Sequence, residues 1–343
     1  MIPTGLPLGH LEAMTDERGL FEHALGDQPR RALGYCVDDV ARGLAVTAPE
    51  DGRSDAAAAL ADCYLRFLES AVTEDGLVHN RMGHGGEWTD EAGLGDWWGR
   101  ALWGLGIAAR RSSRASIRER ATAVFERAAR ARSPWLRALC FAALGAVEMA
   151  GPEGTDAAAL ELLRDAADAI APCRSGASDW RWPESRLRYA NAAIPEALIA
   201  AGRALDDDRL VERGTELLGV LISIESGPDG RLSVTPVGGR GPGDARPAFD
   251  QQPIEAGALA QACLRAFQTT CDDRWLMPLY AAWGWFQGEN DLGIPLFDPV
   301  SGAGYDGLTP EGRNDNRGAE STLAALATLQ CVLSVTRTRG RSR

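Results

Sequence analysis

Apolar residues recur at helical spacing along almost the whole chain, and this spacing predicts eleven helices. The helices come in pairs, in which the first member has the more apolar body and the second is more amphipathic. Long loops rich in glycine and aromatic residues precede the first members, whereas the loops within a pair are short. The predicted helices span residues 37–47, 59–72, 95–106, 117–131, 135–149, 157–171, 192–204, 209–222, 253–268, 273–286 and 319–335.

One motif recurs at the start of the first members: an Asp or Asn in a polar cluster, a charged residue three to five positions later, then a small residue and an apolar helix. Its clearest copy is GDWWGRALWGLG, residues 95–106, in which Asp96 is expected to cap the helix and Arg100 follows one turn later. Weaker or variant copies begin near Asp39, Trp135, Asn191, Gln251 and Asn316.

Antiparallel helix pairs repeated around a ring place every first member inside and every long loop on one rim. The pattern therefore predicts an all-α fold, an (α/α)6 toroid (a six-hairpin barrel), built as one domain over residues 1–343. Residues 1–34 are predicted to be irregular, and residues 337–343 to form a frayed basic tail. No twelfth helix is evident, so the N-terminal segment would have to complete the ring.

Composition and charge narrow the class of partner. The chain has 343 residues, is 45% hydrophobic and carries a formal net charge of −12, which argues against nucleic acid and anionic membrane surfaces as partners. Seven scattered cysteines without a CxxC pair are expected to be free thiols. We find no secretory signal and no apolar run of about 18 residues, so a cytoplasmic protein is expected. The oligomeric state stays open.

Four segments carry a resemblance to a known superfamily: GDWWGRALWGLG, DWRWPESRLRY (residues 179–189), FDQQPIEAGALA (residues 249–260) and RNDNRGAESTLA (residues 313–324). With the repeated pattern, they resemble the six-hairpin glycosidase superfamily over most of the chain. The resemblance implies an (α/α)6 barrel that hydrolyses, phosphorolyses or otherwise reworks glycosides. Some members use adjacent aspartates on an inner helix, as Asp38 and Asp39 would supply, and others use one acid from each of two distant inner helices. Sugar epimerases share the toroid, usually with catalytic histidines.

Glycoside cleavage requires one protonated carboxyl group and a second carboxylate. We expect Asp39 or Asp96 on one side of the cavity and Asp250 or Glu255 on the other. Helix capping is the competing role for the aspartates. A second competing role is ion pairing, because three motif copies carry arginine where the other three carry glutamate. Salt bridges between these two sets would close the inner ring: Arg42, Arg100 and Arg137 against Glu196, Glu255 and Glu320.

The remaining polar and aromatic motif residues are expected to bind the sugar. Indole and phenol rings pack well on the C–H faces of pyranoses, and loop aromatics beside Asp and Asn favour a carbohydrate cleft, although rim packing is their alternative role. The expected substrate-binding residues are Tyr35, Asp38, His79, Trp97, Trp98, Arg100, Trp182, Tyr189, Asn191, Gln251, Gln252, Asn316 and Glu320.

These patterns favour a glycoside hydrolase that acts on an oligosaccharide or another glycoside without a metal or cofactor. Two alternatives stay open. A sugar epimerase or isomerase would need His23 and His79 to face each other inside the cavity. A non-catalytic glycan-binding toroid would expose the indoles but bring no two carboxylates within reach of one glycosidic oxygen. A terpenoid cyclase is disfavoured, because the rims carry Asn, Gln and Arg.

Overall fold

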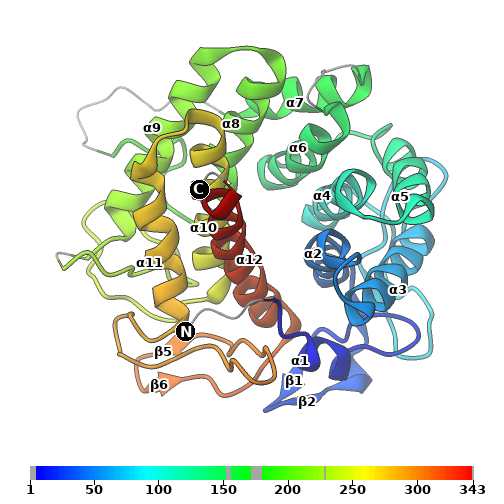
Figure 1. Ribbon diagram of the computed structural model, residues 1–343, viewed down its shortest axis with the longest axis horizontal. Helices are drawn as coiled ribbons and strands as arrows, with labels where there is room; N and C mark the ends of the chain where they lie inside the picture. Colours follow the sequence, from blue (N-terminus) through cyan, green and yellow to red (C-terminus); the bar gives the residue numbers. More distant parts are fainter. Residues whose placement is uncertain (1–4, 152–155, 171–179, 228, 342–343) are drawn as a thin grey trace.

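The computed structural model describes residues 5–151, 156–170, 180–227 and 229–341, and its helices form two concentric layers around a central axis (Figure 1). The inner layer is formed by α2 (Val37–Thr47), α4 (Asp96–Arg111), α6 (Leu136–Ala150), α8 (Ala193–Leu205), α10 (Pro253–Thr270) and α12 (Ala319–Arg341). The outer layer is formed by α3 (Asp55–Ala71), α5 (Ala115–Ala128), α7 (Ala157–Ala169), α9 (Asp208–Glu225) and α11 (Leu276–Phe286).

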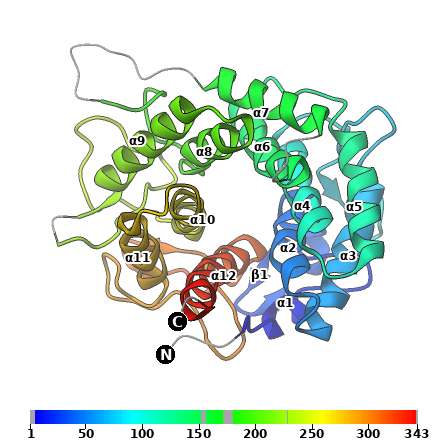
Figure 2. The same cartoon turned by 45° about the horizontal axis from the view of Figure 1, so that its top comes forward.

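The inner helices close into a ring, because each packs on two inner neighbours and α12 packs on α2 (Figure 2). Each outer helix packs on the inner helix that precedes it in the chain. The predicted (α/α)6 toroid is therefore confirmed, and all eleven predicted helices are present with small shifts of their ends. The apolar bodies predicted for the first helix of each pair contribute to the core shared by the two layers.

The sixth outer position is filled by the N-terminal segment, as expected for the missing twelfth helix. The one α-helix among its described residues, α1 (Gly9–Ala13), is a single short turn that packs beside α12. The buried His10 fixes it there, because its backbone N–H donates to Ser301 O at 2.7 Å and its ring Nε2 lies 2.8 Å from Arg317 O. The rest of the segment is largely irregular, as predicted.

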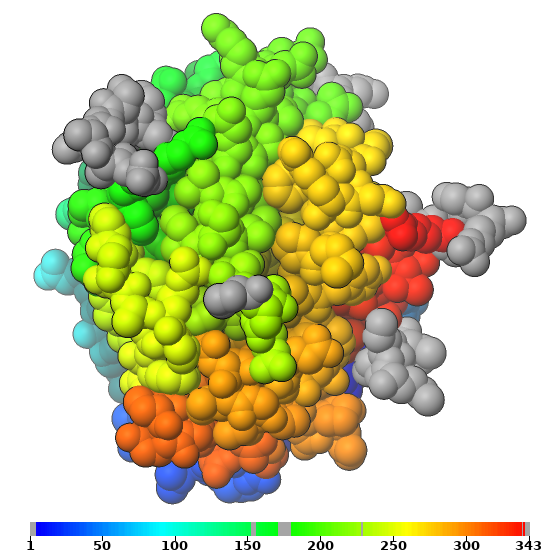
Figure 3. Space-filling view, turned by 90° about the vertical axis from the view of Figure 1, so that its left-hand side faces the viewer, coloured from blue at the N-terminus to red at the C-terminus, as the bar shows by residue number. Residues whose placement is uncertain are grey.

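Three two-stranded sheets, each strand two residues long, join the loops at one end of the ring. β1 (Ala24–Leu25) pairs with β2 (Gln28–Pro29), β3 (Tyr35–Cys36) with β4 (Arg81–Met82), and β5 (Leu308–Thr309) with β6 (Gly312–Arg313), all antiparallel. Three short 3-10 turns, Arg31–Leu33, Ala48–Glu50 and Asp273–Trp275, complete the regular structure of the described residues. Figure 3 shows the loop before α12, in orange, beside the N-terminal segment, in blue, at this end.

The predicted frayed tail is wrong for most of its length. Helix α12 continues to Arg341, and only residues 342–343 of the predicted tail lie outside the described residues. Two of the basic side chains find carboxylates on neighbouring elements: Arg337 pairs with Glu50 at 3.3 Å and Arg339 with Asp273 at 2.6 Å. These ion pairs hold the last turns of the helix against the ring.

Helix α12 is also long and apolar enough to cross a membrane by length and composition alone, over Ala319–Arg337. In the toroid, 72% of that window is buried against other helices. Its apolar residues thus match its place in the inner layer, and core helices of this kind commonly pass the same test.

Glycine lets the inner helices approach until their backbones touch. Gly104 of α4 faces Ala41 of α2, and Gly106 faces Gly145 of α6; a Cβ atom at either α4 position would overlap the opposing carbonyl group. Helix α4 therefore packs closely on both neighbours, which fixes the first turn of α4 relative to those of α2 and α6.

Gly106→Ala is expected to destabilise the protein by about 1–3 kcal/mol, because the added methyl group must displace the backbone of α6. Gly219 of α9 is the matched control: it is exposed, a Cβ there meets nothing within 4 Å, and Gly219→Ala should stabilise by about 0.5–1 kcal/mol through helix propensity. Urea unfolding measures both changes. Equal effects of the two substitutions would contradict close packing between α4 and α6.

Candidate active site

A cavity of about 600 Å³ opens at the end of the ring where the inner helices begin. The first turns of α2, α4, α10 and α12 contribute to its wall, together with the rim loops. Helix N-termini carry partial positive charge, which favours negative groups at this end. The cavity is lined by Glu22, His23, Cys36, Asp38, Asp39, Arg42, Asn80, Arg81, Asp96, Trp97, Tyr189, Gln252, Pro253, Asp306, Asn314, Gly318, Glu320 and Ser321.

Seven of the residues predicted for the site line this cavity: Asp38, Asp39, Asp96, Trp97, Tyr189, Gln252 and Glu320. The sequence analysis missed several others, notably Glu22, Arg81 and Asp306. These lie in loops outside the repeated motif. The long-range pairing of β3 with β4 brings Arg81 to the cavity, and the backbone bond from Ala319 N to Glu22 O, at 3.0 Å, joins Glu22 to the start of α12.

The two acids predicted for the far side of the cavity are placed elsewhere. Asp250 is exposed in the loop before α10 and is not part of the lining. Glu255 is buried behind the wall, where it accepts hydrogen bonds from Ala190 N at 2.5 Å and Asn191 Nδ2 at 3.0 Å. Burial, followed by the charge of Glu225, raises the pKa of Glu255 to about 8. Glu255 and Asn191 thus secure the loop that carries Tyr189.

Three aromatic residues predicted to stack on the sugar belong to the core. Trp98 is fully buried and donates from Nε1 to Ala128 O at 3.1 Å. Trp182 is buried among apolar side chains. Tyr35 is buried, and its hydroxyl donates to Asp16 at 2.8 Å. Of the five candidate aromatic residues, only Trp97 and Tyr189 therefore reach the cavity.

Four polar residues also prove to support the wall rather than line it. The buried Gln251 donates to Asp291 at 2.6 Å, and Asn316 accepts from Gly26 N at 3.0 Å. His79 stacks on Trp88, and its Nδ1 lies 3.0 Å from Asp90 O. Arg100 lies over the Phe141 ring and donates to the Tyr189 hydroxyl at 3.1 Å, so it orients a lining residue.

Only one of the predicted salt bridges between inner helices exists as expected. Arg42 joins two helices, since it contacts Asp39 of its own helix at 2.6 Å and Glu320 of α12 at 2.8 Å. The other predicted partners pair differently: Arg137 with Glu184 at 2.7 Å and Glu196 with Arg265 at 3.1 Å. The sequence predicted correctly that these charged residues lie on the inner helices, but it did not predict their partners. Glu184 comes from a loop, and Arg265 comes from a later turn of α10.

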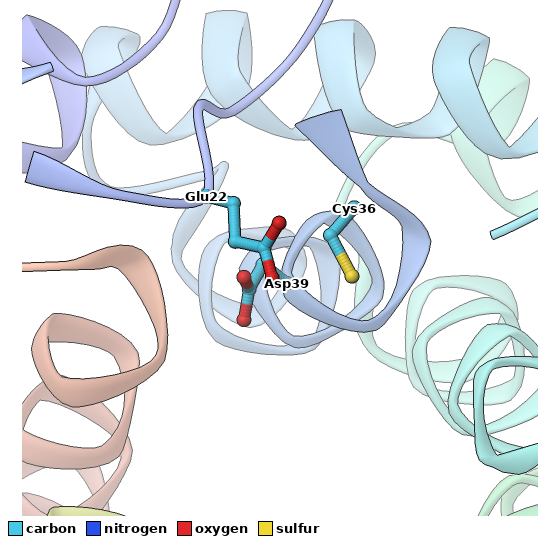
Figure 4. A group of neighbouring side chains, drawn as sticks. All are labelled: Glu22, Cys36 and Asp39. Carbon is cyan, nitrogen blue, oxygen red and sulfur yellow. The ribbon is translucent and has the colours of Figure 1, made fainter. Parts of the chain in front are cut away.

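Asp39 lies at the back of the cavity beside Glu22 and Cys36, and the ligand atoms of the three residues lie within 4.8 Å of one another (Figure 4). Burial raises the pKa of Asp39 to about 7, against the opposing effect of Arg42. The pKa of the Cys36 thiol is also raised by burial, and the thiol donates to Asn80 Oδ1 at 3.3 Å. The group has donor types suited to a divalent metal, but arginines already neutralise both carboxylates.

Six carboxylates line the cavity, and four are held by the protein. Arg42 pairs with Asp39 and Glu320, and Arg81 pairs with Glu22. Asp306 accepts from Gly318 N at 2.8 Å. The remaining two, Asp38 and Asp96, form no ion pair with the described residues.

Asp38 and Asp96 keep their oxygen atoms available. The buried Oδ1 of Asp38 has no hydrogen-bond partner among the described residues, and its Oδ2 receives only a long contact from the Cys36 thiol, at 3.8 Å. Asp96 is not the N-cap that the sequence suggested: Gly95 holds that position, and no side chain caps α4. Burial raises the pKa of Asp96, and the nearby charge of Asp38 raises it further.

The histidines do not form the pair that an epimerase of this kind would require. All four lie in the described part of the chain, and only His23 reaches the cavity, with Nε2 3.7 Å from Glu22. His79 is held against Trp88 outside the lining, and His10 is buried beside α12. The two histidines proposed to face each other therefore do not do so.

Solved structures with this fold include enzymes of several reaction types. A sugar epimerase from a ruminal bacterium has a TM-score of 0.68 at 14% identity, covering 95% of this chain and 95% of that chain. A cellobiose 2-epimerase from Bacillus thermoamylovorans has a TM-score of 0.69 at 11% identity, covering 97% and 96%. A GH76 α-mannanase from Bacteroides thetaiotaomicron has a TM-score of 0.65 at 11% identity, covering 96% and 95%.

Neither a protein-family model nor a curated protein matches the sequence. At identities this low, the structural likeness shows the fold alone. The fold is the six-hairpin (α/α)6 toroid that the sequence resemblance predicted.

Arg42→Leu is expected to destabilise the protein more at pH 8 than at pH 5. At pH 8 the substitution leaves a charged Asp39 buried without its partner, which costs on the order of 3–5 kcal/mol. The carboxyl group is neutral below its raised pKa, so less stability is lost there. Between pH 5 and pH 8 the Asp39 carboxyl group binds its proton more tightly in the native state than in the unfolded chain. The stability of the variant therefore falls as pH rises.

Urea unfolding at the two pH values measures this difference. Arg66→Leu is the control, because its ion pair with Asp62 is exposed and should change stability by no more than about 0.5 kcal/mol at either pH. An Arg42 variant that lost the same free energy at both pH values would show that Asp39 is not the group responsible.

Proposed function

We propose that the protein is a carbohydrate-active enzyme and, specifically, a glycoside hydrolase that uses Asp96 as general acid and Asp38 as the second carboxylate. The observation that carries this proposal is that these two acids line the cavity without a charged partner, whereas the other four carboxylates are held by the protein. The fold supports a sugar as substrate, because neighbours of this fold include a mannanase and sugar epimerases.

Asp96 suits the role of the acid. A general acid must hold its proton near neutral pH, and burial together with the charge of Asp38 raises the pKa of Asp96. Its place in the first turn of α4 sets it at the cavity wall, and no cap hydrogen bond ties it to the helix. It would donate its proton to the oxygen of the leaving sugar as the glycosidic bond breaks.

Asp38 suits the role of the second carboxylate, because its oxygen atoms are not committed to protein donors. It lies in the first turn of α2, the inner neighbour of α4. An ionised Asp38 would either remove a proton from the attacking water or attack the anomeric carbon directly. In both cases its charge also maintains the acid form of Asp96.

Water fits this cavity better than phosphate does as the group that accepts the sugar. Phosphorolysis requires free cationic groups to hold the phosphate. The lining contains two arginines, and both are engaged: Arg42 with Asp39 and Glu320, and Arg81 with Glu22. The six carboxylates around them would repel a phosphate dianion. These contacts favour hydrolysis.

A sugar epimerase or isomerase is the second candidate, because several structural neighbours carry those names and His23 lines the cavity beside Glu22. Such a reaction would exchange a carbon-bound hydrogen of the sugar with solvent. His23 would be its single histidine in the cavity. Deuterium uptake from D₂O into cellobiose or mannose, followed by NMR, distinguishes this candidate from hydrolysis, which leaves every C–H bond of the sugar intact.

Asp96→Asn and Asp38→Asn are each expected to lower kcat by at least about 100-fold while leaving unfolding temperature nearly unchanged. Each variant removes a group that the reaction needs and that the protein fold does not use. Product release from manno-, cello-, malto- and chito-oligosaccharides measures activity. Asp250→Asn is the matched control, because this exposed carboxylate lies outside the cavity lining and its loss should leave the rate unchanged. Wild-type rates in both cavity variants would refute the assignment.

Leaving-group and pH dependence separate the two roles. The wild-type kcat/KM should fall as pH rises through the raised pKa of Asp96, because the acid form is lost. Asp96→Asn should abolish this alkaline fall and retain activity on a dinitrophenyl glycoside, whose leaving group needs no proton. Asp38→Asn should lose activity on both kinds of substrate. If Asp96→Asn were equally inactive on the activated glycoside, Asp96 would not be the general acid.

A further inference from the structure

Trp135 differs from every other tryptophan of the chain in its exposure. The side chain is 63% exposed, whereas the other nine tryptophans are buried or half-buried. No aromatic ring or cation of the described residues is seen to contact its indole. The copy of the repeated sequence motif near Trp135 is weak, because it contains no acidic residue. The proposed mechanism does not use Trp135.

Trp135 lies at the same end of the ring as the cavity. It is the N-cap residue of α6, and α6 lies between α4 and α8 in the inner layer (Figure 1). The first turn of α4 carries Asp96, and Tyr189 precedes α8; both line the cavity. The indole is therefore located on the rim, between two segments that contribute to the site.

Ser133 links the Trp135 backbone to the segment before α4, and Arg137, in the first turn of α6, contacts the segment before α8. The buried Ser133 hydroxyl accepts from Trp135 N at 3.1 Å and donates at 2.7 Å to Leu94 O, two residues before Asp96. On the other side, Arg137 donates to Tyr189 O at 2.7 Å. The close approach of α4 and α6 through glycine makes this part of the rim stiff. The backbone that carries the indole is thus held in place before any ligand arrives.

An exposed indole on a fixed backbone beside a sugar site is suited to stack on a pyranose ring. The ring offers a large apolar face at little cost in conformational entropy, and sugar C–H groups pack on such faces. Resting on the proposed function, we infer that Trp135 forms an outer subsite for a neutral oligosaccharide that extends from the cavity across the start of α6. The substrate would then be longer than the part that the cavity encloses.

Fluorine NMR on protein labelled with 5-fluorotryptophan tests this inference. Trp135→Phe and Trp97→Phe identify the resonance of the rim indole and of the cavity indole. Manno-, cello-, malto- and chito-oligosaccharides of one to six sugars are added to the Asp96→Asn variant, which should not consume them. We expect one series to shift the Trp97 resonance at every length and the Trp135 resonance only with the longer members.

The remaining outcomes separate the two proposals. A series that shifted Trp97 at all lengths but never Trp135 would overturn the outer subsite and leave the proposed function standing. If neither resonance responded to any of the four series, the outer subsite and the choice of a sugar substrate would both be rejected.

Kinetics give a second measurement. Trp135→Ala should raise KM for the longest bound oligosaccharide by about tenfold, with kcat and the KM of an aryl monoglycoside unchanged, and Trp135→Phe should restore most of the loss. Met277→Ala is the matched control, because Met277 is 74% exposed on the outer helix α11. Equal effects of Trp135→Ala on long and short substrates would count against a subsite at the rim.

Discussion

Close backbone contact between neighbouring inner helices is the constraint on which the site depends. Glycines of α4 and α6, with Ala41 of α2 opposite Gly104, leave no room for larger side chains where these helices touch, so their relative heights and spacing are fixed. Their first turns consequently meet at one mouth, where Asp38, Asp39 and Asp96 face the same space. The close packing of the ring therefore brings three of the six lining carboxylates together, and the rim loops add Glu22 and Asp306.

Within the cavity, most of the charged side chains are bound by other groups of the protein. Arg42 and Arg81 neutralise three of the six carboxylates, and a backbone amide holds a fourth. Dense negative charge would otherwise be costly in a partly buried cavity. Among the lining carboxylates, only Asp38 and Asp96, on the adjacent helices α2 and α4, have no ion pair with the described residues. The charge on Asp38 favours the protonated form of Asp96.

The helical repeat could be predicted from the sequence because the apolar periodicity and the recurring motif are local signals. The same signals placed Asp39, Asp96 and Glu320 at the start of inner helices, and the structure brings these residues into one cavity. They could not show that Glu255 points behind the wall to hold Asn191, or that the indole of Trp98 turns into the core. Glu22 and Arg81 reach the cavity only through long-range pairing of loops, which leaves no periodic trace in the sequence.

The contact of α12 with α2 joins the last helix of the chain to the first long one, and Arg42 to Glu320 is its charged link. Asp39 therefore has its complete electrostatic surroundings only when both segments are present. During synthesis α2 to α10 leave the ribosome before α12, so the cavity lacks one wall until α12 has followed. Maturation of the site and topological closure of the ring are thus the same event.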